Sequence, residues 1–259
     1  MPPSSTSPRP PPSLRPPPLL GVVHRKFAVV GHRGAGKSSV TRRFVQEKFT
    51  IQSAADPDEE SLYRKVLETE GEERGVAKRK SSHEKTTQLV CCDIVDTPGP
   101  TRQYTEYAKE EFSRFLSRNA LIGIHGYLLV YDITSRESFT IIQTLNEVVL
   151  RYHGDSPVPR VLLGGKLDLC AQRQVGKGEG RALARTLGIP FLEISAKHNV
   201  DVERAFRLLL EEVERGEAGE GKGKWSLLGG EEEEQAFLGC RHERERSWEY
   251  DGYGYCVVS

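Results

Sequence analysis

Residues 31–38 of this 259-residue chain read GHRGAGKS, and this stretch decides the fold. The apolar run Lys26–Val30 comes directly before it, and a segment with helical spacing begins at Lys37. A GxxxxGK[ST] string between a strand and a helix is typical of a loop whose backbone N–H groups surround phosphates. The sequence therefore predicts a phosphate site at this turn. A glycine-rich turn without a ligand is the alternative.

The residue types in this loop suit phosphate and magnesium chemistry. Glycine lets the backbone direct its N–H groups inward, and the following helix adds the partial positive charge of its N-terminus. We expect the Lys37 ammonium to reach the outer phosphates and the Ser38 hydroxyl to ligate Mg²⁺. The predicted phosphate-binding set is Gly31, Arg33, Gly34, Ala35, Gly36, Lys37, Ser38 and Ser39.

Outward from the loop, short apolar runs alternate with helical segments, as in parallel strands joined by crossover helices. The expected strands are residues 26–30, 63–68, 88–95, 126–133, 160–163 and 190–194. The expected helices follow Lys37, Thr105, Ser135, Lys177 and Val202, the last continuing to about Val213. We therefore predict an α/β domain over residues 24–215, with a six-stranded, mostly parallel sheet and five flanking helices.

The ends of the chain and one internal loop differ from this domain in composition. Nine of the fifteen prolines lie within residues 1–20, so residues 1–23 are predicted to be a disordered arm. Residues 216–259, rich in Gly, Glu and Arg, are predicted to be a flexible tail. Residues 69–86 form an inserted charged loop, which is either a solvated hairpin extension or an effector-contacting or phosphorylated loop.

Composition and charge exclude several classes of protein. Lys and Arg total 37, as do Asp and Glu, so the chain lacks the basic field that non-specific nucleic-acid binding needs. Five cysteines without CxxC spacing argue against a disulfide framework or a zinc site. The longest apolar run, residues 121–133, is too short and interrupted to span a bilayer, and no secretory signal is present. We expect a cytoplasmic monomer that binds no nucleic acid.

Three further strings follow expected strands. Residues 96–99 read DTPG, where the Asp96 carboxylate could hold Mg²⁺ through water and the Gly99 N–H could approach a terminal phosphate. Alone, such a string is an ordinary turn. Residues 165–168 read GKLD and residues 193–197 read EISAK. Ligands of open α/β sheets bind at the carboxyl ends of strands, so these strings are expected to share one site.

The order and spacing of these motifs resemble the Ras family of small GTPases over about residues 24–215. The resemblance is to Rheb-like members in particular, because Arg33 stands in the phosphate loop and residues 124–131 read IHGYLLVY, followed by Thr134-Ser135. It implies a Ras-like P-loop NTPase domain that binds GDP or GTP with Mg²⁺. It also implies effector and regulator proteins as partners.

The chemistry of guanine supports the resemblance. An Asp168 carboxylate can accept hydrogen bonds from both N1–H and N2–H of guanine, but would face the unmatched N1 acceptor of adenine. Lys166 can lie along the ring, and the Ala196 N–H can donate to guanine O6. The predicted base-binding set is Lys166, Asp168, Ser195, Ala196 and Lys197.

Four positions depart from the family pattern. Gly165 replaces the Asn that ties the base-binding loop to the phosphate loop, so looser binding is expected. Asp58 replaces the Thr that senses the γ-phosphate; it could still ligate Mg²⁺ but would repel that phosphate, which leaves the on/off contrast open. Pro100 replaces the Gln that orients the attacking water, so hydrolysis is expected to be slow. Arg33 either neutralises phosphate charge or obstructs a partner's arginine finger.

Lys37 and Gly99 are therefore the predicted catalytic groups, and Ser38, Asp96 and Asp58 are the predicted metal ligands. From these residues and the resemblance, we expect a slow GTPase that acts as a signalling switch. The alternative is a pseudo-GTPase scaffold that binds nucleotide without effective hydrolysis. An ATP-using P-loop kinase is disfavoured by Asp168 together with residues 195–197.

Residues 256–259 read CVVS and satisfy the CaaX pattern, in which a terminal Ser favours farnesylation of Cys256. Residues 217–259 hold ten acidic and five basic side chains, a formal balance of 5 − 10 = −5, which anionic lipids would repel. Cys240 is either palmitoylated or unmodified. We expect weak, reversible attachment to the cytosolic face of membranes.

Overall fold

The computed structural model describes most of the predicted domain and two short pieces of the tail. The described residues are 19–49, 61–71, 86–100, 110, 112–113, 122–154, 156, 158–218, 249–250 and 256–257. Residues 1–221 and residues 222–259 form two separate units, and each is considered by itself. No helix among these residues is both long and apolar enough to cross a membrane.

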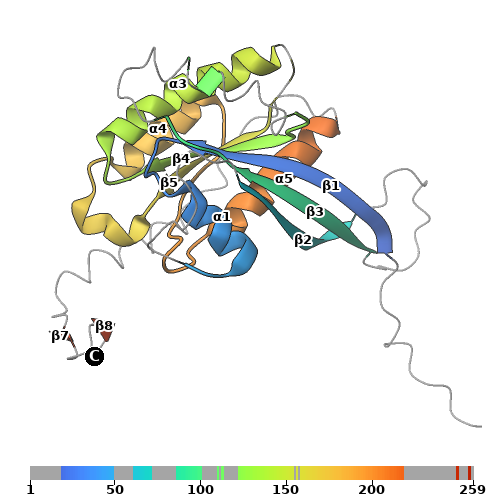
Figure 1. Ribbon diagram of the computed structural model, residues 1–259, viewed down its shortest axis with the longest axis horizontal. Helices are drawn as coiled ribbons and strands as arrows, with labels where there is room; N and C mark the ends of the chain where they lie inside the picture. Colours follow the sequence, from blue (N-terminus) through green and yellow to red (C-terminus); the bar gives the residue numbers. More distant parts are fainter. Residues whose placement is uncertain are drawn as a thin grey trace, which may run out of the picture. The chain divides into compact units, whose positions relative to one another are not determined.

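The first unit contains a six-stranded sheet with the order β2-β3-β1-β4-β5-β6 (Figure 1). Its strands are β1 (Leu19–Gly31), β2 (Ser61–Gly71), β3 (Thr86–Asp96), β4 (Gly126–Asp132), β5 (Arg160–Gly165) and β6 (Phe191–Glu193). β2 is antiparallel to β3, and every other neighbouring pair is parallel. The predicted α/β class and mostly parallel sheet are confirmed.

Helices cover both faces of this sheet, with α3 and α4 on one side and α1 and α5 on the other (Figure 1). Their bounds are α1 Lys37–Gln46, α3 Arg136–His153, α4 Lys177–Leu187 and α5 Val202–Glu217, with a short 3₁₀ helix, η3, at Leu167–Gln172. The helices expected after Lys37, Ser135, Lys177 and Val202 are thus confirmed, and η3 was not predicted. The helix expected after Thr105 lies largely outside the described residues; the three described residues of that stretch, Glu110, Phe112 and Ser113, are helical.

Burial explains why the central strands carry continuous apolar sequence. All seven residues of β4 are buried, as expected for a parallel strand covered on both faces. β2, at the sheet edge, instead alternates: Leu62 and Val66 are exposed, whereas Leu67 is buried. Between the sheet, α1 and α5, the rings of Phe44 and Phe206 stack with their centroids 3.8 Å apart.

Three boundaries differ from the sequence expectations. β1 begins at Leu19, so residues 19–23 belong to the sheet and not to the N-terminal arm. β2 and β3 stay paired as far as Gly71 and Thr86, so the ends of the inserted loop are a hairpin extension; residues 72–85 lie outside the description. Residues 19–23 read LLGVV, an apolar run interrupted by Gly21, and this part of β1 is paired in parallel with β3.

The second unit differs from the expected structureless tail in one respect. β7 (Glu249–Tyr250) and β8 (Cys256–Val257) pair as two short antiparallel strands. Cys256, the predicted lipid acceptor, lies in β8 and pairs with Tyr250. The other residues of this unit lie outside the description, whereas residues 216 and 217 of the predicted tail belong to α5.

Candidate nucleotide-binding site

The phosphate loop occupies residues 32–36, between the end of β1 and the start of α1. Gly34 and Gly36 have φ angles of 81° and 97°, in the left-handed region that favours glycine. The loop closes on itself through a hydrogen bond from the Ala35 N–H to the His32 carbonyl, with N and O 3.1 Å apart. Gly31 lies against β4, where a Cβ atom would approach the Val130 carbonyl oxygen to 2.1 Å. These glycines give the sharp strand-to-helix turn that the motif predicts.

Lys37 is a buried cation at the first position of α1. Lys37 is only 6% exposed, and its Nζ donates a hydrogen bond to the His32 carbonyl oxygen at 3.0 Å. Burial lowers the pKa of Lys37 from 10.5 to about 8; the Asp96 carboxylate opposes this shift and the Arg33 guanidinium adds to it. An ammonium with so little water around it would be stabilised by an anion such as phosphate.

Asp96, the last residue of β3, faces the same loop and is 6% exposed. Burial raises its pKa, whereas a hydrogen bond with Ser38 and the charge of Lys37 lower it. One carboxylate oxygen, Oδ1, is fully buried and has no hydrogen-bond partner among the described residues. Mg²⁺ prefers carboxylate and hydroxyl oxygens, so Ser38 and Asp96 suit that ion. Asp58, the third predicted metal ligand, lies outside the described residues.

The segment after β3 is packed on the phosphate loop. Thr97 Oγ1 donates to the Val29 carbonyl at 2.7 Å, which fixes the start of the segment to β1. A Cβ atom on Gly99 would lie only 2.5 Å from the Arg33 backbone nitrogen, so glycine alone fits here without displacing backbone. The Arg33 N–H in turn donates to the Pro100 carbonyl, with N and O 3.3 Å apart. Any group that binds the phosphate loop therefore adjoins residues 97–100.

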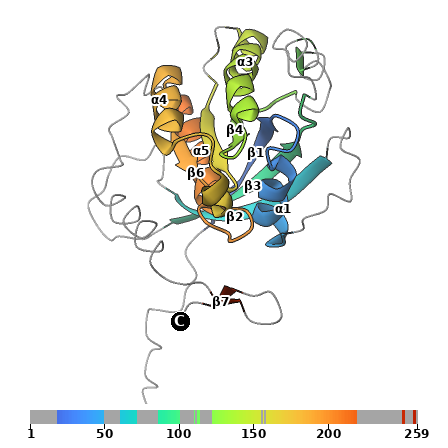
Figure 2. The ribbon, with the colours of Figure 1, turned by 90° about the vertical axis from the view of Figure 1, so that its left-hand side faces the viewer.

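The loops after β5 and β6 meet beside the phosphate loop. Ser195 Oγ donates to Asp168 Oδ1 at 2.7 Å, which orients the carboxylate proposed to read the base. The Leu167 N–H donates to the Ile194 carbonyl at 3.1 Å, and a Cβ on Gly36 would lie 3.9 Å from Cε of Lys166. Figure 2 looks onto this edge of the sheet, where the phosphate loop and α1 (blue), η3 (gold) and the loop after β6 (orange) come together.

Comparison with known proteins agrees with this arrangement. A sequence model of a protein family, described as the Ras family, matches residues 26–215. The chain belongs to the Ras family.

Rheb proteins are among the similar members of that family. The "GTP-binding protein Rheb homolog" of Dictyostelium discoideum is 35% identical over 196 residues, which cover 76% of this chain and 91% of that protein. The "GTP-binding protein rhb1" of Schizosaccharomyces pombe is 35% identical over 209 residues, covering 79% and 98%. "GTP-binding protein Rheb" of Homo sapiens is 33% identical over 206 residues, covering 79% and 97%. The predicted Rheb-like character of this Ras-family chain is confirmed.

Within this Ras-family domain, the structure brings the predicted phosphate and base residues to one edge of the sheet. Ser39 lies in the first turn of α1, and Ala196 is buried in the loop after β6. Lys197 is exposed, and its backbone carbonyl accepts a hydrogen bond from the Arg43 guanidinium. Gly165 ends β5, where a Cβ atom would lie 3.3 Å from the Ala35 carbonyl oxygen of the phosphate loop.

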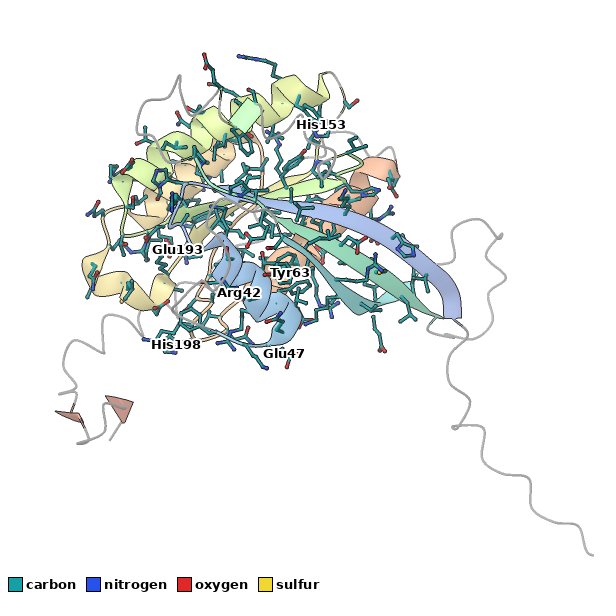
Figure 3. The ribbon with its side chains drawn as sticks, viewed as in Figure 1. Arg42, Glu47, Tyr63, His153, Glu193 and His198 are labelled. Atoms are coloured by element: carbon teal, nitrogen blue, oxygen red, sulfur yellow. The ribbon has the colours of Figure 1, made fainter. Side chains whose placement is uncertain are left out.

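Two residues of the site were missed by the sequence expectations. Arg43 of α1 donates from Nε to the Ala196 carbonyl at 2.7 Å and from a terminal nitrogen to the Lys197 carbonyl at 3.0 Å. Figure 3 shows Arg42 on the same helix and Glu47 just after its last residue. Asp132, at the end of β4, forms an ion pair with Lys166, with Oδ2 and Nζ 2.7 Å apart. Nothing local marks Arg43, whereas the position of Asp132 at the carboxyl end of a buried strand was an available signal.

Proposed function

We propose that the protein binds GDP and GTP with Mg²⁺ and hydrolyses GTP slowly as a signalling switch. The observation that carries this proposal is the meeting of two sites at one edge of the sheet. A buried Lys37 and an unpartnered Asp96 oxygen lie at the phosphate loop, and an Asp168 carboxylate held by Ser195 lies at the neighbouring loops. Family membership and the relatives named as GTP-binding proteins support the same nucleotide.

In this proposal, each part of the pocket has a separate task. Backbone N–H groups of residues 34–38 and the Lys37 ammonium hold the phosphates, while Ser38 and Asp96 hold Mg²⁺. When bound, the metal ion supplies positive charge to the phosphate oxygens. Asp168 accepts hydrogen bonds from the guanine edge, and the Ala196 N–H donates to guanine O6. Catalysis is then mainly positioning and charge neutralisation by Lys37 and the Gly99 backbone.

The first experiment measures the affinity of the full chain for GDP, GTP, ADP and ATP, with and without Mg²⁺, by calorimetry. We expect guanine nucleotides to bind at least a hundredfold more tightly than adenine nucleotides, because adenine leaves Asp168 without donors. The variant Asp168→Asn should lose GDP affinity and gain affinity for xanthosine diphosphate, whose O2 accepts from the new amide. Absence of binding heat with both GDP and GTP would refute the proposal.

A pseudo-GTPase scaffold is the second candidate, and Pro100 is the observation that favours it. Proline brings no donor or acceptor to a water molecule beside the phosphate loop. Single-turnover hydrolysis by the wild-type chain and an Asp96→Ala variant separates the two functions. Equal phosphate release by both would leave only the scaffold, whereas a slower variant supports the GTPase.

We further propose that Cys256 is farnesylated where the mature chain ends at Ser259. A single isoprenoid gives only reversible membrane binding, and the formal charge of −5 over residues 217–259 adds no attraction to anionic lipids. Labelling with a farnesyl precursor should modify the wild-type chain and leave Cys256→Ser unlabelled. Cys240→Ser is the matched control, and it should be labelled as the wild type is; label retained by Cys256→Ser would contradict the assignment.

A further inference from the structure

We propose that Asp132 is a positioning residue for nucleotide binding, which compensates through Lys166 for the side chain that Gly165 lacks. This inference rests on the proposed function. It concerns how the base-binding loop, residues 165–168, is held in place before a nucleotide arrives.

The first step is the geometry at Gly165. An ideal Cβ there would lie 3.3 Å from the Ala35 carbonyl oxygen and 3.3 Å from the Tyr131 carbonyl oxygen. A side chain at this position would therefore point at the phosphate loop, where an amide could donate to Ala35. Glycine makes no such contact, so the link between base loop and phosphate loop must come from other atoms.

The second step is the ion pair beside it. Lys166 Nζ lies 2.7 Å from Asp132 Oδ2, and the Asp132 side chain is only 9% exposed while that of Lys166 is 36% exposed. A charge-assisted contact with one partner buried is stronger than an exposed surface pair. It also fixes the Lys166 stem next to Gly36, so the side chain spans from the base loop to the phosphate loop.

The third step is that both members of the pair are themselves held. Asp132 Oδ1 accepts from the Thr134 N–H at 2.8 Å and from the Thr134 hydroxyl at 2.7 Å, which leaves Oδ2 directed at Lys166. The Lys166 backbone has a φ of 62°, a left-handed conformation that is unfavourable for a side chain with a Cβ and persists only where the surroundings impose it. Its carbonyl accepts from the Leu169 N–H at 2.9 Å.

These contacts assign a separate task to each carboxylate of the base site. Asp168, held by Ser195, reads the guanine edge, whereas Asp132, held by Thr134, sets the direction of the Lys166 side chain along the base. A side chain that is already placed loses less conformational freedom when the nucleotide binds. Asp132 therefore lowers the dissociation rate of the nucleotide without touching it.

The test is the GDP dissociation rate of the full chain and of Asp132→Asn. The Asn variant keeps an oxygen for Thr134 and removes the charge opposite Lys166. Loss of one charge-assisted contact should raise the rate roughly tenfold. In a Lys166→Met background, the same Asp132 substitution should change the rate less than about twofold, because its partner is already absent. An unchanged rate in Asp132→Asn, or a full effect in the Lys166→Met background, would overturn the proposal.

A rescue variant tests the compensation itself. Gly165→Asn in the Asp132→Asn background supplies an amide beside the Ala35 carbonyl and should recover most of the lost affinity. A Cβ atom at residue 165 would lie 3.3 Å from the Ala35 and Tyr131 carbonyl oxygens. These two carbonyl groups would therefore have to shift by only a few tenths of an ångström to accept the Asn side chain. Failure to recover any affinity would refute the compensation.

A purely structural role for Asp132 has a different signature. The ratio of GDP to inosine diphosphate affinity reports on Asp168, because inosine lacks only the 2-amino group. We expect Asp132→Asn to leave this ratio unchanged; a collapse of the ratio would show a displaced base site and overturn the positioning role. If Asp132→Asn does not fold, Asp132→Ser is the second variant. Absence of GDP binding by the wild type would instead reject the proposed function.

Discussion

Under the proposed function, Pro100 stands at the position where a side chain would meet the attacking water. The residue is buried, and its backbone carbonyl accepts from the Arg33 N–H at 3.3 Å. Its backbone therefore joins two loops of the site, while its ring has neither a donor nor an acceptor for water. The proposed slow hydrolysis follows from this: nucleotide would be held here while residue 100 gives the attacking water no orienting group.

Substituting Pro100 should therefore change hydrolysis more than binding. We expect Pro100→Gln to raise the single-turnover rate of GTP hydrolysis roughly tenfold, because the amide can align a water molecule. Phosphate release from protein preloaded with GTP measures the rate. Pro100→Ala is the matched control, since it keeps the backbone carbonyl and adds no amide. Equal rates for the Gln and Ala variants would show that residue 100 does not limit hydrolysis.

The position of α1 depends on a pair of aromatic rings that are far apart in sequence. Phe44 of α1 and Phe206 of α5 are 2% and 0% exposed, and their rings stack at an interplanar angle of 10°. Lys65 of β2 adds an ammonium 4.7 Å from the centre of the Phe44 ring and donates to the Phe44 carbonyl at 2.6 Å. Because α1 begins at Lys37, this packing also places the phosphate loop.

Phe44→Ala should lower the free energy of unfolding by about 3–5 kcal/mol, as expected for truncating a buried phenylalanine. Urea denaturation at a fixed GDP concentration measures the change. Phe44→Leu keeps most of the volume and should lose less than the Ala variant does. Gln46→Ala, at an exposed position of the same helix, should stay within about 0.5 kcal/mol of the wild type. A loss below 1 kcal/mol in Phe44→Ala would contradict the role assigned to this contact.

The start of α4 carries an exposed ionic contact that responds to pH. Glu179 accepts from the Arg136 guanidinium at 3.0 Å and from the Gly176 N–H at 2.9 Å, which satisfies a donor at the helix N-terminus. Arg136 first, and then the Gly176 N–H, lower the pKa of Glu179 from 4.5 to about 2. The contact links α3 to α4 on the face of the sheet that both helices cover.

A folded-state pKa below the unfolded value means that this carboxylate contributes stability above about pH 4.5. The contribution should be lost as pH falls from 4.5 towards 2, where the proton binds in both states. We expect the midpoint of thermal unfolding of Glu179→Gln to lie below that of the wild type at pH 6–7. The gap should close as pH falls to about 2. Glu211→Gln, an exposed change on α5, is the control; a constant gap for Glu179→Gln would disprove the assignment.

The whole sheet explains why distant motifs share one site. The strand order changes direction at β1, which lies between β3 and β4, and the phosphate loop follows this strand. Parallel strands end at the same edge, so the loops after β1, β3, β5 and β6 converge there. In the proposed function, packing of residues 97–100 on the phosphate loop couples a nucleotide bound there to the segment after β3.

This coupling predicts a difference between nucleotide states of the complete chain. Hydrogen exchange at the amides of residues 33–36 and of Thr97 and Gly99 should be slower with a non-hydrolysable GTP analogue than with GDP, because an additional phosphate adds contacts to both segments. β4, which is buried along its whole length, should exchange equally in the two states and serves as the internal control. Identical exchange of Thr97 and Gly99 in both states would contradict the switch while leaving nucleotide binding intact.

Local patterns in the sequence determined the α/β class, the centres of all six strands of the sheet within a few residues, and the phosphate and base motifs. Each of these depends on neighbours along the chain: apolar runs, helical spacing, and glycines that permit a tight turn. The short β6, Phe191–Glu193, was also found, because Pro190 and the following motif bracket it. The same patterns identified the Ras-family resemblance.

Tertiary structure alone decided the remaining features. β1 extends to Leu19 because β3 pairs with it, and Arg43 belongs to the site because α1 lies beside the loop after β6. The pairing of Asp132 with Lys166 joins residues of two different strand ends, and Gly99 meets the phosphate loop across the sheet edge. Contacts between residues so far apart in the chain leave no periodic trace in the sequence, because they are created only when the sheet brings its strand ends together.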